Sequence, residues 1–214
     1  KRAEDYVDDY EYRQDEGVSA PPGAPPYGPP LVVHFDPAKV QAMAGALGLP
    51  VWPEPRPKPV LWLAIDDGSG PRLVGLAQAN AARSILDRAK ARGYKLGLPA
   101  GNAAEQAAAG AIWRGDTAAI ARISSRYSPP MQLIGKLSRK GAGWHADWTL
   151  VDNGRVLSRW SDDDGDARRA MASGADGAAD ALVKRYAKRS GPGVGSPGSY
   201  TVSFAGIDGT DDYI

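Results

Sequence analysis

The sequence predicts an α/β protein of the mixed, α+β-like kind, in which a central mixed sheet is flanked by partial N-terminal and C-terminal segments. The first observation is an apolar run at residues 60–65, bounded by prolines and by Asp67-Gly68, which is typical of a strand buried on both faces. The second is a succession of three alternating segments with short glycine turns, which indicates an antiparallel meander. The third is a stripe of small residues at helical spacing after the meander, which favours a helix packed closely on the sheet.

Charge and cysteine content exclude several classes of function. The 214 residues include 26 basic and 25 acidic side chains, and this balance argues against a nucleic-acid partner held by bulk electrostatics. The chain has no cysteine, so disulfides, thiolate nucleophiles and zinc–thiolate sites are excluded. No apolar run approaches the roughly 18 residues of a membrane-spanning helix, so we expect no transmembrane segment. The chain starts at Lys1 rather than Met, and we expect a processed product whose signal peptide has been removed.

Residues 1–56 are expected to form a partial N-terminal segment. The last part of residues 1–13 alternates like a half-exposed strand, and the apolar residues 31–35 supply a second strand, which together give a hairpin. Asp36, followed by a proline, is a helix cap, and the helix that it starts ends near Gly48.

Two proline-rich stretches separate the predicted elements. Residues 14–30 supply too little apolar surface and too few backbone donors for regular structure, so they predict a flexible or polyproline-like loop. A docking peptide for an aromatic groove is the functional alternative for residues 20–30, but we favour a surface loop without a partner. Residues 50–59 carry five prolines and indicate a stiff connector, which places a domain boundary before residue 57.

Residues 57–190 are expected to form a central mixed α/β domain that folds by itself. Its predicted elements are a strand at 60–65, a helix at 80–93, a short strand at 94–99, an alanine-rich helix at 103–112, a helix capped by Asp116, three strands at 131–137, 144–151 and 155–160, and a long helix at 164–189. The stripe of the long helix includes Gly174 and Ala178, and we expect it to press on a sheet built by Trp62 and the meander.

Residues 191–214 are expected to be a linker followed by the start of a truncated C-terminal segment. Glycine and proline dominate residues 191–198, which indicates a linker. Residues 200–207 alternate as a strand, and residues 208–214 predict a loop or the beginning of a helix.

Several motifs together resemble the bacterial domain-of-unknown-function family 2066. They are Leu-Trp-Leu-Ala-Ile-Asp-Asp-Gly at 61–68, Ala-Arg-Ile-Ser-Ser-Arg-Tyr at 121–127, Leu-Ile-Gly-Lys-Leu at 133–137, Gly-Trp-His-Ala-Asp-Trp-Thr-Leu at 143–150 and Asp-Gly-Ala-Ala-Asp-Ala-Leu at 176–182. Residues 2–12 are similar to the family's connection to an upstream domain, whereas the insertion at 20–30 departs from the family pattern. The resemblance implies a periplasmic or cell-envelope protein of gammaproteobacteria, and it supplies no catalytic residue.

The order of elements in the central domain is also similar to that of the amino-terminal domain of TolB and of envelope modules of the CsgG and FlgT type. This likeness is an analogy of topology, and a shared fold by itself licenses no function.

Three motifs invite a chemical interpretation. Asp66-Asp67, at the end of a central strand, lie where ligands bind in many open sheets, but with the glycine that follows they are also ordinary turn residues, which we favour. Residues 162–166 are similar to a calcium loop, yet the glycine comes too early and Ser173 stands where a bidentate glutamate is needed, so we expect a solvated turn. Residues 193–198 match a dinucleotide glycine pattern, but they follow a helix and precede a strand, so we expect a linker.

The histidines and tryptophans are the remaining candidates. His34 and His145 both lie in predicted strands without the neighbouring acid and nucleophile of a catalytic triad. His145 and Asp147 share one strand face, which indicates a solvent-facing pair. Most of the six tryptophans are expected in the core, and an exposed Trp113 or Trp52 is a candidate for a partner surface.

The sequence thus predicts no catalytic, cofactor-binding or metal-binding residue. We expect a non-catalytic envelope protein, an interaction or assembly module whose partner is another envelope protein. The alternative is a small-ligand or nucleotide-binding protein that uses the carboxyl ends of the strands at 60–65 and 94–98.

Overall fold

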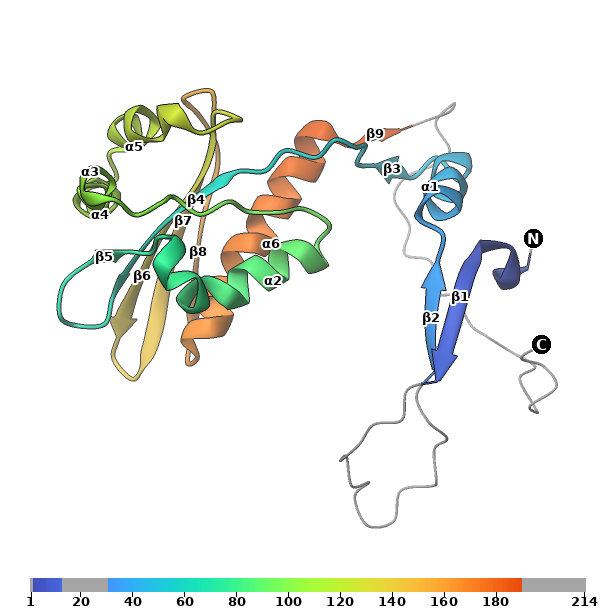
Figure 1. Cartoon of the computed structure of the whole chain (residues 1–214), viewed down its shortest axis with the longest axis horizontal. Helices are drawn as coiled ribbons and strands as arrows, with labels where there is room; N and C mark the ends of the chain where they lie inside the picture. Colours follow the sequence, from blue (N-terminus) through green and yellow to red (C-terminus); the bar gives the residue numbers. More distant parts are fainter. Residues whose placement is uncertain (1, 13–30, 190–214) are drawn as a thin grey trace, which may run out of the picture. The chain divides into compact units, whose positions relative to one another are not determined.

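A computed structural model describes residues 2–12 and 31–189 of the chain (Figure 1). The contacts between residues divide the chain into two compact units. Unit 1 consists of Lys1–Val51 and Arg189–Ile214, and unit 2 consists of Trp52–Lys188. Each unit is described by itself.

Unit 1 contains a β-hairpin followed by one helix. Its elements in the N-terminal part are η1 (Ala3–Tyr6), β1 (Val7–Tyr12), β2 (Leu31–Phe35), α1 (Pro37–Ala46) and β3 (Pro50–Val51). The predicted hairpin is confirmed, because β1 and β2 pair antiparallel. The predicted cap is also confirmed, since Asp36 Oδ1 accepts from the backbone N–H groups of Ala38 and Lys39 at 2.8 and 3.3 Å. No residue of α1 is buried, so this helix covers no core in the described part of unit 1.

Unit 2 is built on a five-stranded mixed sheet. Its elements are β4 (Val60–Asp66), β5 (Arg72–Leu73), η2 (Leu76–Ala82), α2 (Arg83–Ala91), α3 (Ala103–Gln106), α4 (Ala108–Trp113), α5 (Thr117–Ile123), η3 (Ser124–Arg126), β6 (Met131–Lys140), β7 (Gly143–Asp152), β8 (Arg155–Asp164) and α6 (Ala167–Tyr186). The strand order is β5-β4-β6-β7-β8, with β4 parallel to β6 and the other neighbours antiparallel. The predicted α/β class, central strand and meander are therefore confirmed. A separate two-stranded sheet pairs β3 with β9 (Lys188–Arg189).

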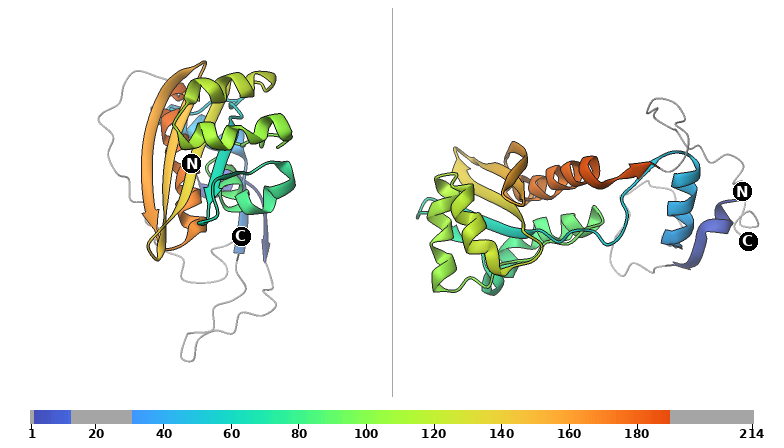
Figure 2. Two further views of the ribbon diagram at one scale, coloured as in Figure 1. Left: turned by 90° about the vertical axis from the view of Figure 1, so that its left-hand side faces the viewer. Right: turned by 90° about the horizontal axis from the view of Figure 1, so that it is seen from above.

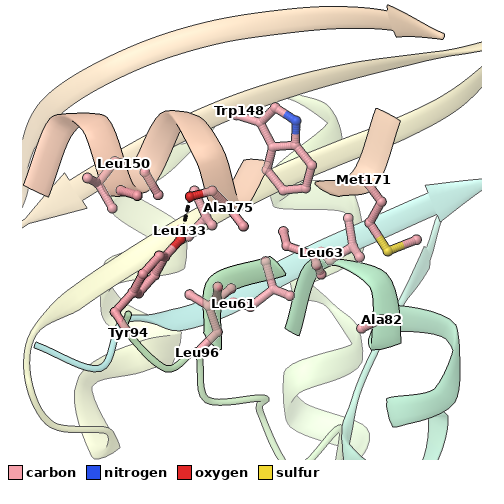
Figure 3. Close-up of a cluster of buried hydrophobic side chains, with 14 of the residues drawn as sticks. Leu61, Leu63, Ala82, Tyr94, Leu96, Leu133, Trp148, Leu150, Met171 and Ala175 are labelled. Atoms are coloured by element: carbon pink, nitrogen blue, oxygen red, sulfur yellow. Dashed lines mark hydrogen bonds between the residues drawn. The ribbon is translucent and has the colours of Figure 1, made fainter. Parts of the chain in front are cut away.

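One face of the sheet packs against α2 and α6, which lie side by side (Figures 1 and 2). Leu61 and Leu63 of β4 and Trp148 of β7 are almost completely buried in this layer, as Figure 3 shows. The hydroxyl of Tyr94 donates a hydrogen bond of 2.8 Å to the backbone carbonyl of Ala175 in α6. Burial raises the pKa of Tyr94, which keeps this hydroxyl protonated as a donor.

Helix α6 approaches the sheet closely because two of its glycines face indole rings. Gly174 lies against Trp148, and Gly177 lies against Trp160. The close packing of small residues that the sequence predicts is thus confirmed. Trp62 belongs to this sheet as expected, but its side chain lies in the core on the opposite face. Successive side chains of a strand point to opposite faces of the sheet. Because Leu61 and Leu63 point toward α2 and α6, Trp62 between them points to the other face.

The second face of the sheet is only partly covered by helices. Val60, Trp62 and Ile134 pack there with Ile112 of α4 and Ile120 of α5. Helix α4 contacts β4, β5 and β6. Polar side chains occupy this face over the outer part of the meander, where they border the candidate site described below.

The second predicted strand, at residues 94–99, is not formed. Only Gly97 bridges to β4, where it accepts from the backbone N–H of Leu61 at 2.7 Å and donates to the carbonyl of Pro59 at 2.9 Å. Pro59 and Pro99 lack an N–H group, so the prolines on either side prevent a longer ladder.

Two predicted helices are shorter than expected. Instead of one helix at 80–93, the 3₁₀ helix η2 leads into α2, which begins at Arg83. Instead of a helix at 164–189, β8 continues to Asp164, and the carboxylate of Asp166 caps α6 by accepting from the backbone N–H of Arg168 at 2.7 Å. The cap determines where the helix starts.

The proline-rich connector is not uniformly exposed. Trp52 is 7% exposed, and its ring lies 5.9 Å from that of Tyr94 in unit 2. Arg56 donates from Nη1 to the carbonyl of Gly93 and from Nη2 to the carbonyl of Trp52. Unit 2 therefore begins at Trp52, five residues before the boundary at Pro57 that the prolines indicate.

Candidate functional site

A groove of about 360 Å³ lies on the second face of the sheet in unit 2. One wall is the turn between α4 and α5, at residues 113–117, and the floor is the outer face of β6, β7 and β8. Lys136 and Asp147 lie directly opposite each other on β6 and β7, and Thr149 and Arg159 form the neighbouring pair on β7 and β8. These residues line the hollow, which we call the groove.

Three cationic side chains line the groove: Arg114, Lys136 and Arg159. Within the part of the chain that the structure describes, none of them forms an ion pair with a carboxylate. The ammonium group of Lys136 lies 5.0 Å from the ring centroid of Trp113, a cation–π contact between the floor and the wall. Arg114 and Arg159 are exposed, so their guanidinium groups are accessible to a ligand.

The two acidic residues of the groove are already engaged. Asp116 Oδ1 accepts a hydrogen bond of 2.9 Å from the backbone N–H of Ala119, which caps α5 as the sequence predicts. Asp147 Oδ1 lies 3.2 Å from Nε2 of His145. With three cations and two acids, the groove carries an excess of one positive charge.

An ion-pair cluster adjoins the groove on the same sheet face. Nδ1 of His145 lies 2.6 Å from Oδ1 of Asp163, and Nζ of Lys140 lies 2.8 Å from Oδ2 of the same aspartate. The hydrogen bond with Asp163 is the largest cause that raises the pKa of His145, and the charge of Asp147 adds to it. The pKa of Asp163 is lowered, chiefly by the hydrogen bond from Lys140 and next by that from His145.

Three residues of this cluster are arranged in a row that is similar to a catalytic triad. The register places Ser138, His145 and Asp163 opposite one another on β6, β7 and β8. In a serine hydrolase the Nε2 atom of the histidine accepts the proton of the serine. Here Nε2 faces Asp147, so both ring nitrogens lie against carboxylates. This arrangement favours an imidazolium ion, which cannot act as a base.

The wall of the groove is fixed by buried polar contacts behind it. The carboxylate of Glu105 is 3% exposed and accepts hydrogen bonds from the hydroxyl of Tyr127 at 2.5 Å and from the backbone N–H of Gly101 at 2.6 Å. Burial raises the pKa of Tyr127, and the hydrogen bond with Glu105 raises it further. Nε1 of Trp62 donates to Ser124 Oγ at 3.1 Å. These contacts hold α3, η3 and β4 together, and the α4–α5 turn lies between them in sequence.

The structure places Asp66 at the end of β4 and Asp67 in the bend that follows, and both make the turn contacts that the sequence predicts. Asp66 Oδ1 accepts from the backbone N–H groups of Gly68 and Gly70 at 2.8 and 3.0 Å, and Gly68 has a φ of 110°. Asp67 pairs with Arg72 at 2.8 Å. Both carboxylates are therefore used in local turn contacts.

The acidic residues 162–166 do not converge on one point either. Asp164 binds Arg169, with 2.9 Å between Oδ1 and Nη2, and Asp166 caps α6. Ser173, which stands at the position of the missing glutamate, accepts instead from Nε1 of Trp148 at 3.2 Å. Across residues 2–12 and 31–189, no group of three side chains could hold a metal ion.

The two histidines are not brought together, and the two candidate tryptophans differ. His34 lies in unit 1, 3.9 Å from Asp9 on the paired strand, whereas His145 belongs to the cluster in unit 2. Trp113 is half-buried in the wall of the groove and is not among the fully exposed side chains. Trp52 is buried, so its proposed role on a partner surface is wrong.

The proline-rich loop at 14–30, the glycine pattern at 193–198 and the expected strand at 200–207 lie outside the described residues. Among the helices of the described part, none is long and apolar enough to cross a membrane.

Comparisons with protein-family models, with curated proteins and with solved structures find no match to this chain. The resemblance to family 2066 therefore stays a hypothesis that rests on the motifs quoted above, and the likeness to the TolB-type modules stays one that rests on the order of elements.

Sequence reasoning missed the residues that define the groove. Lys136 lies between two buried residues of one predicted strand and Arg159 between two half-buried residues of another, which indicates a polar sheet face. Arg114 follows a helix that is rich in alanine, and no local pattern distinguishes it from a solvent-exposed arginine. The signal that was available is the alternation of the strands, but it does not show that the three cations share one groove.

Proposed function

We propose that this protein is a non-catalytic interaction or assembly module of the bacterial cell envelope and that unit 1 contacts its partner. The contact surface consists of Phe35, Met43, Leu47 and Leu49, and we name it the unit 1 apolar surface. Its partner is another envelope protein.

The observation that supports this proposal is the exposure of large apolar side chains on a very small structure. Phe35 is 54% exposed and Leu47 is 58% exposed, and Met43 and Leu49 are each 38% exposed. A hollow of about 580 Å³ between η1 and α1 includes Met43 and Leu47 in its lining. Scattered apolar residues are normal on a protein surface, but a group of them on one helix and its flanking chain indicates an interaction site.

The low burial of apolar surface in the described part of unit 1 favours a partner that covers it. A two-stranded hairpin is marginally stable in water unless a further strand or a helix covers its apolar face. Helix α1 buries no residue, so the described part of unit 1 gains little from the hydrophobic effect. A partner that covers Phe35 and Leu47 would supply the missing burial.

The envelope location has a different basis. It follows from the resemblance of the motifs at 61–68 and 143–150 to family 2066, whose members the resemblance places in the periplasm or cell envelope. The balanced charge and the lack of cysteine are compatible with that compartment.

Affinity capture with matched variants tests the proposal. The full chain, a Leu47→Ser variant and a Leu76→Ser control would each be immobilised and exposed to envelope extract at low and high salt. Leu76 is 60% exposed and belongs to unit 2, so the control removes an equally exposed leucine outside the proposed surface.

We expect one protein, identified by mass spectrometry, to bind the wild type and the Leu76→Ser control at both salt concentrations and to be lost with Leu47→Ser. Apolar contacts are weakly affected by salt, unlike surface ion pairs. Equal capture by all three chains, or no capture by the wild type, would contradict the proposal.

The alternative of a ligand at the carboxyl ends of two adjacent strands loses its structural basis. The segment at 94–98 is not a strand, and Asp66 is engaged in a turn at the end of β4. These observations favour a ligand site elsewhere in unit 2.

A further inference from the structure

We propose that the groove of unit 2 binds a small organic anion with a flat apolar body, such as an aromatic carboxylate or an aromatic phosphate. The groove lies on the face of the sheet and not at the strand ends, so this site differs from the one that the sequence suggests. The inference is independent of the proposed function, because every lining residue belongs to unit 2.

The charged side chains of the groove favour the binding of an anion. Arg114, Lys136 and Arg159 line it and have no carboxylate partner among the described residues. By contrast, Arg92 of unit 2 binds the carboxylates of Asp176 and Asp180. Guanidinium groups bind carboxylate and phosphate through paired N–H donors, so Arg114 and Arg159 are suited to both kinds of anion.

The two acids in the groove are outnumbered by its three cations, which leaves a surplus of one positive charge. Asp116 is held by the backbone N–H of Ala119, and Asp147 faces His145. An anion that enters beside Thr117 and Thr149 would also meet hydroxyl groups that can donate hydrogen bonds.

The size and the apolar lining of the groove favour a small ligand with an apolar part. A volume of about 360 Å³ is at the lower end of the range for small-molecule sites. The half-buried indole of Trp113 and the edges of Ile112 and Ile134 supply apolar lining next to the cations. The contact between Lys136 and Trp113 keeps the ammonium group beside the aromatic wall, so a charged group and an aromatic body would be bound at adjacent positions.

A matched set of naphthalene compounds tests the ligand class. The full chain would be titrated by calorimetry with 2-naphthoate, 2-naphthyl phosphate, the neutral 2-naphthamide and inorganic phosphate. The first two compounds distinguish a carboxylate from a phosphate ligand. The third removes the charge but keeps the apolar body, and the fourth keeps the charge but removes the body.

Two variants locate the site. Arg159→Gln removes a cation of the groove, and Arg155→Gln is the matched control, because Arg155 is also exposed on β8, lacks a carboxylate partner in the described chain and lies outside the groove. Lys136→Met is a second groove variant that keeps the length of the apolar stem. Far-ultraviolet circular dichroism and thermal melts would show that each variant is folded.

We expect at least one naphthalene anion to bind about tenfold more tightly than the amide, since a charge-assisted hydrogen bond is roughly twice as strong as a neutral one. Arg159→Gln and Lys136→Met should each weaken that binding by about tenfold. Arg155→Gln should stay within about twofold of the wild type at about 0.15 M salt, where distant charges are screened.

Three results would overturn the inference. The first is equal binding of the amide and the anions, or no binding of either anion up to about 10 mM. The second is an equal loss of affinity in Arg159→Gln and Arg155→Gln. The third is binding of inorganic phosphate as tight as that of 2-naphthyl phosphate, which would show that the apolar walls contribute nothing. A failed capture experiment with the Leu47→Ser variant would leave all of these outcomes unaffected, since Leu47 lies in unit 1.

Discussion

Gly174 of α6 lies directly against the indole ring of Trp148, so close that a Cβ atom on Gly174 would come within 2.6 Å of Cε2 of that ring. The ring is held in place, since Nε1 of Trp148 donates to Ser173 Oγ at 3.2 Å and the side chain is 1% exposed. We therefore expect Gly174→Ala to lower the free energy of unfolding by about 1–3 kcal/mol through overpacking. Urea denaturation of the full chain would measure the change.

Gly110→Ala is the matched control for this prediction. Gly110 is also a helical glycine, but the nearest atom to its Cβ position is Nη1 of Arg114 at 3.1 Å, the end of a flexible side chain. Alanine is favoured over glycine inside a helix by up to about 1 kcal/mol, so this variant should be neutral or stabilised. Equal destabilisation of the two variants would mean that the contact with Trp148 is not the cause.

The pairing of α2 with α6 depends partly on Asp176. Oδ1 of this residue lies 2.8 Å from Nε of Arg88 and 2.8 Å from Nη1 of Arg92. Burial opposes ionisation of Asp176, but the hydrogen bonds from the two arginines lower its pKa overall. The side chains are about a third to a half exposed, so we expect Asp176→Asn to cost only about 1 kcal/mol.

A salt titration checks the electrostatic origin of this cost. The difference between wild type and Asp176→Asn in urea midpoint should shrink as salt rises. Asp180→Asn should have a smaller effect, because Asp180 is 72% exposed and pairs only with Arg92. A cost for Asp176→Asn that does not depend on salt would contradict this account.

The His145 cluster predicts a pH-dependent contribution to stability. The pKa of His145 is raised in the folded state, first by Asp163, so the imidazolium form stabilises the fold. This contribution is fully present below the unfolded pKa of about 6.5 and is lost as the pH rises through the folded pKa. We expect His145→Gln to lower the urea midpoint more at about pH 5.5 than at about pH 9.

His34→Gln provides the comparison for the other histidine. The atoms of the His34–Asp9 pair are 3.9 Å apart, and both side chains are more than half exposed. The effect of this substitution should therefore change less between the two pH values. A loss in His145→Gln that is the same at both pH values would show that the ion pairs of the cluster do not matter.

Trp52 should determine where the folded domain begins. A fragment of residues 52–188 should fold by itself, since both cores of unit 2 consist of its residues. A fragment of residues 57–188 lacks Trp52, which is 7% exposed, and loses the contacts of Arg56 with Gly93. We expect the shorter fragment to be less stable by about 3–5 kcal/mol, the usual cost of removing a buried tryptophan. Equal urea midpoints for the two fragments would contradict the placement of Trp52.

The fold of unit 2 was largely predictable because its strands have strong local signals. The apolar run at 60–65 and the turn at Asn153-Gly154 mark a central strand and a hairpin, and Asn153 indeed has a φ of 48°. The strand at 94–99 was mispredicted because its pairing is limited at both ends, by Pro99 within the segment and by Pro59 on the chain that it bridges, and a local pattern does not show the effect of Pro59. The burial of Trp52 was missed for a similar reason. The proline content of residues 50–59 describes the local chain, but it does not show which residues pack against unit 2.

The groove was harder to predict because a register shift creates it. Asp152 pairs with Arg155 and Val151 pairs with Val156, and continuing this register would put Arg159 opposite Trp148. An irregularity between Leu150 and Val151 shifts the pairing by one residue. Arg159 is therefore opposite Thr149, on the side that faces the groove. A shift of one residue moves a side chain to the other face of a sheet, and no turn motif in the sequence marks the shift between Leu150 and Val151.

Photo-crosslinking at Leu47 tests the central claim most directly. A photoreactive phenylalanine analogue would replace Leu47 in one variant and Leu76 in another, two leucines that are 58% and 60% exposed on units 1 and 2. After irradiation of producing cells, the account predicts one discrete cross-linked protein from position 47 and none from position 76. A product at twice the mass of the chain would identify a second copy as the partner and would contradict the proposal of another envelope protein. The same products from both positions, or none from position 47, would contradict a partner at the unit 1 apolar surface.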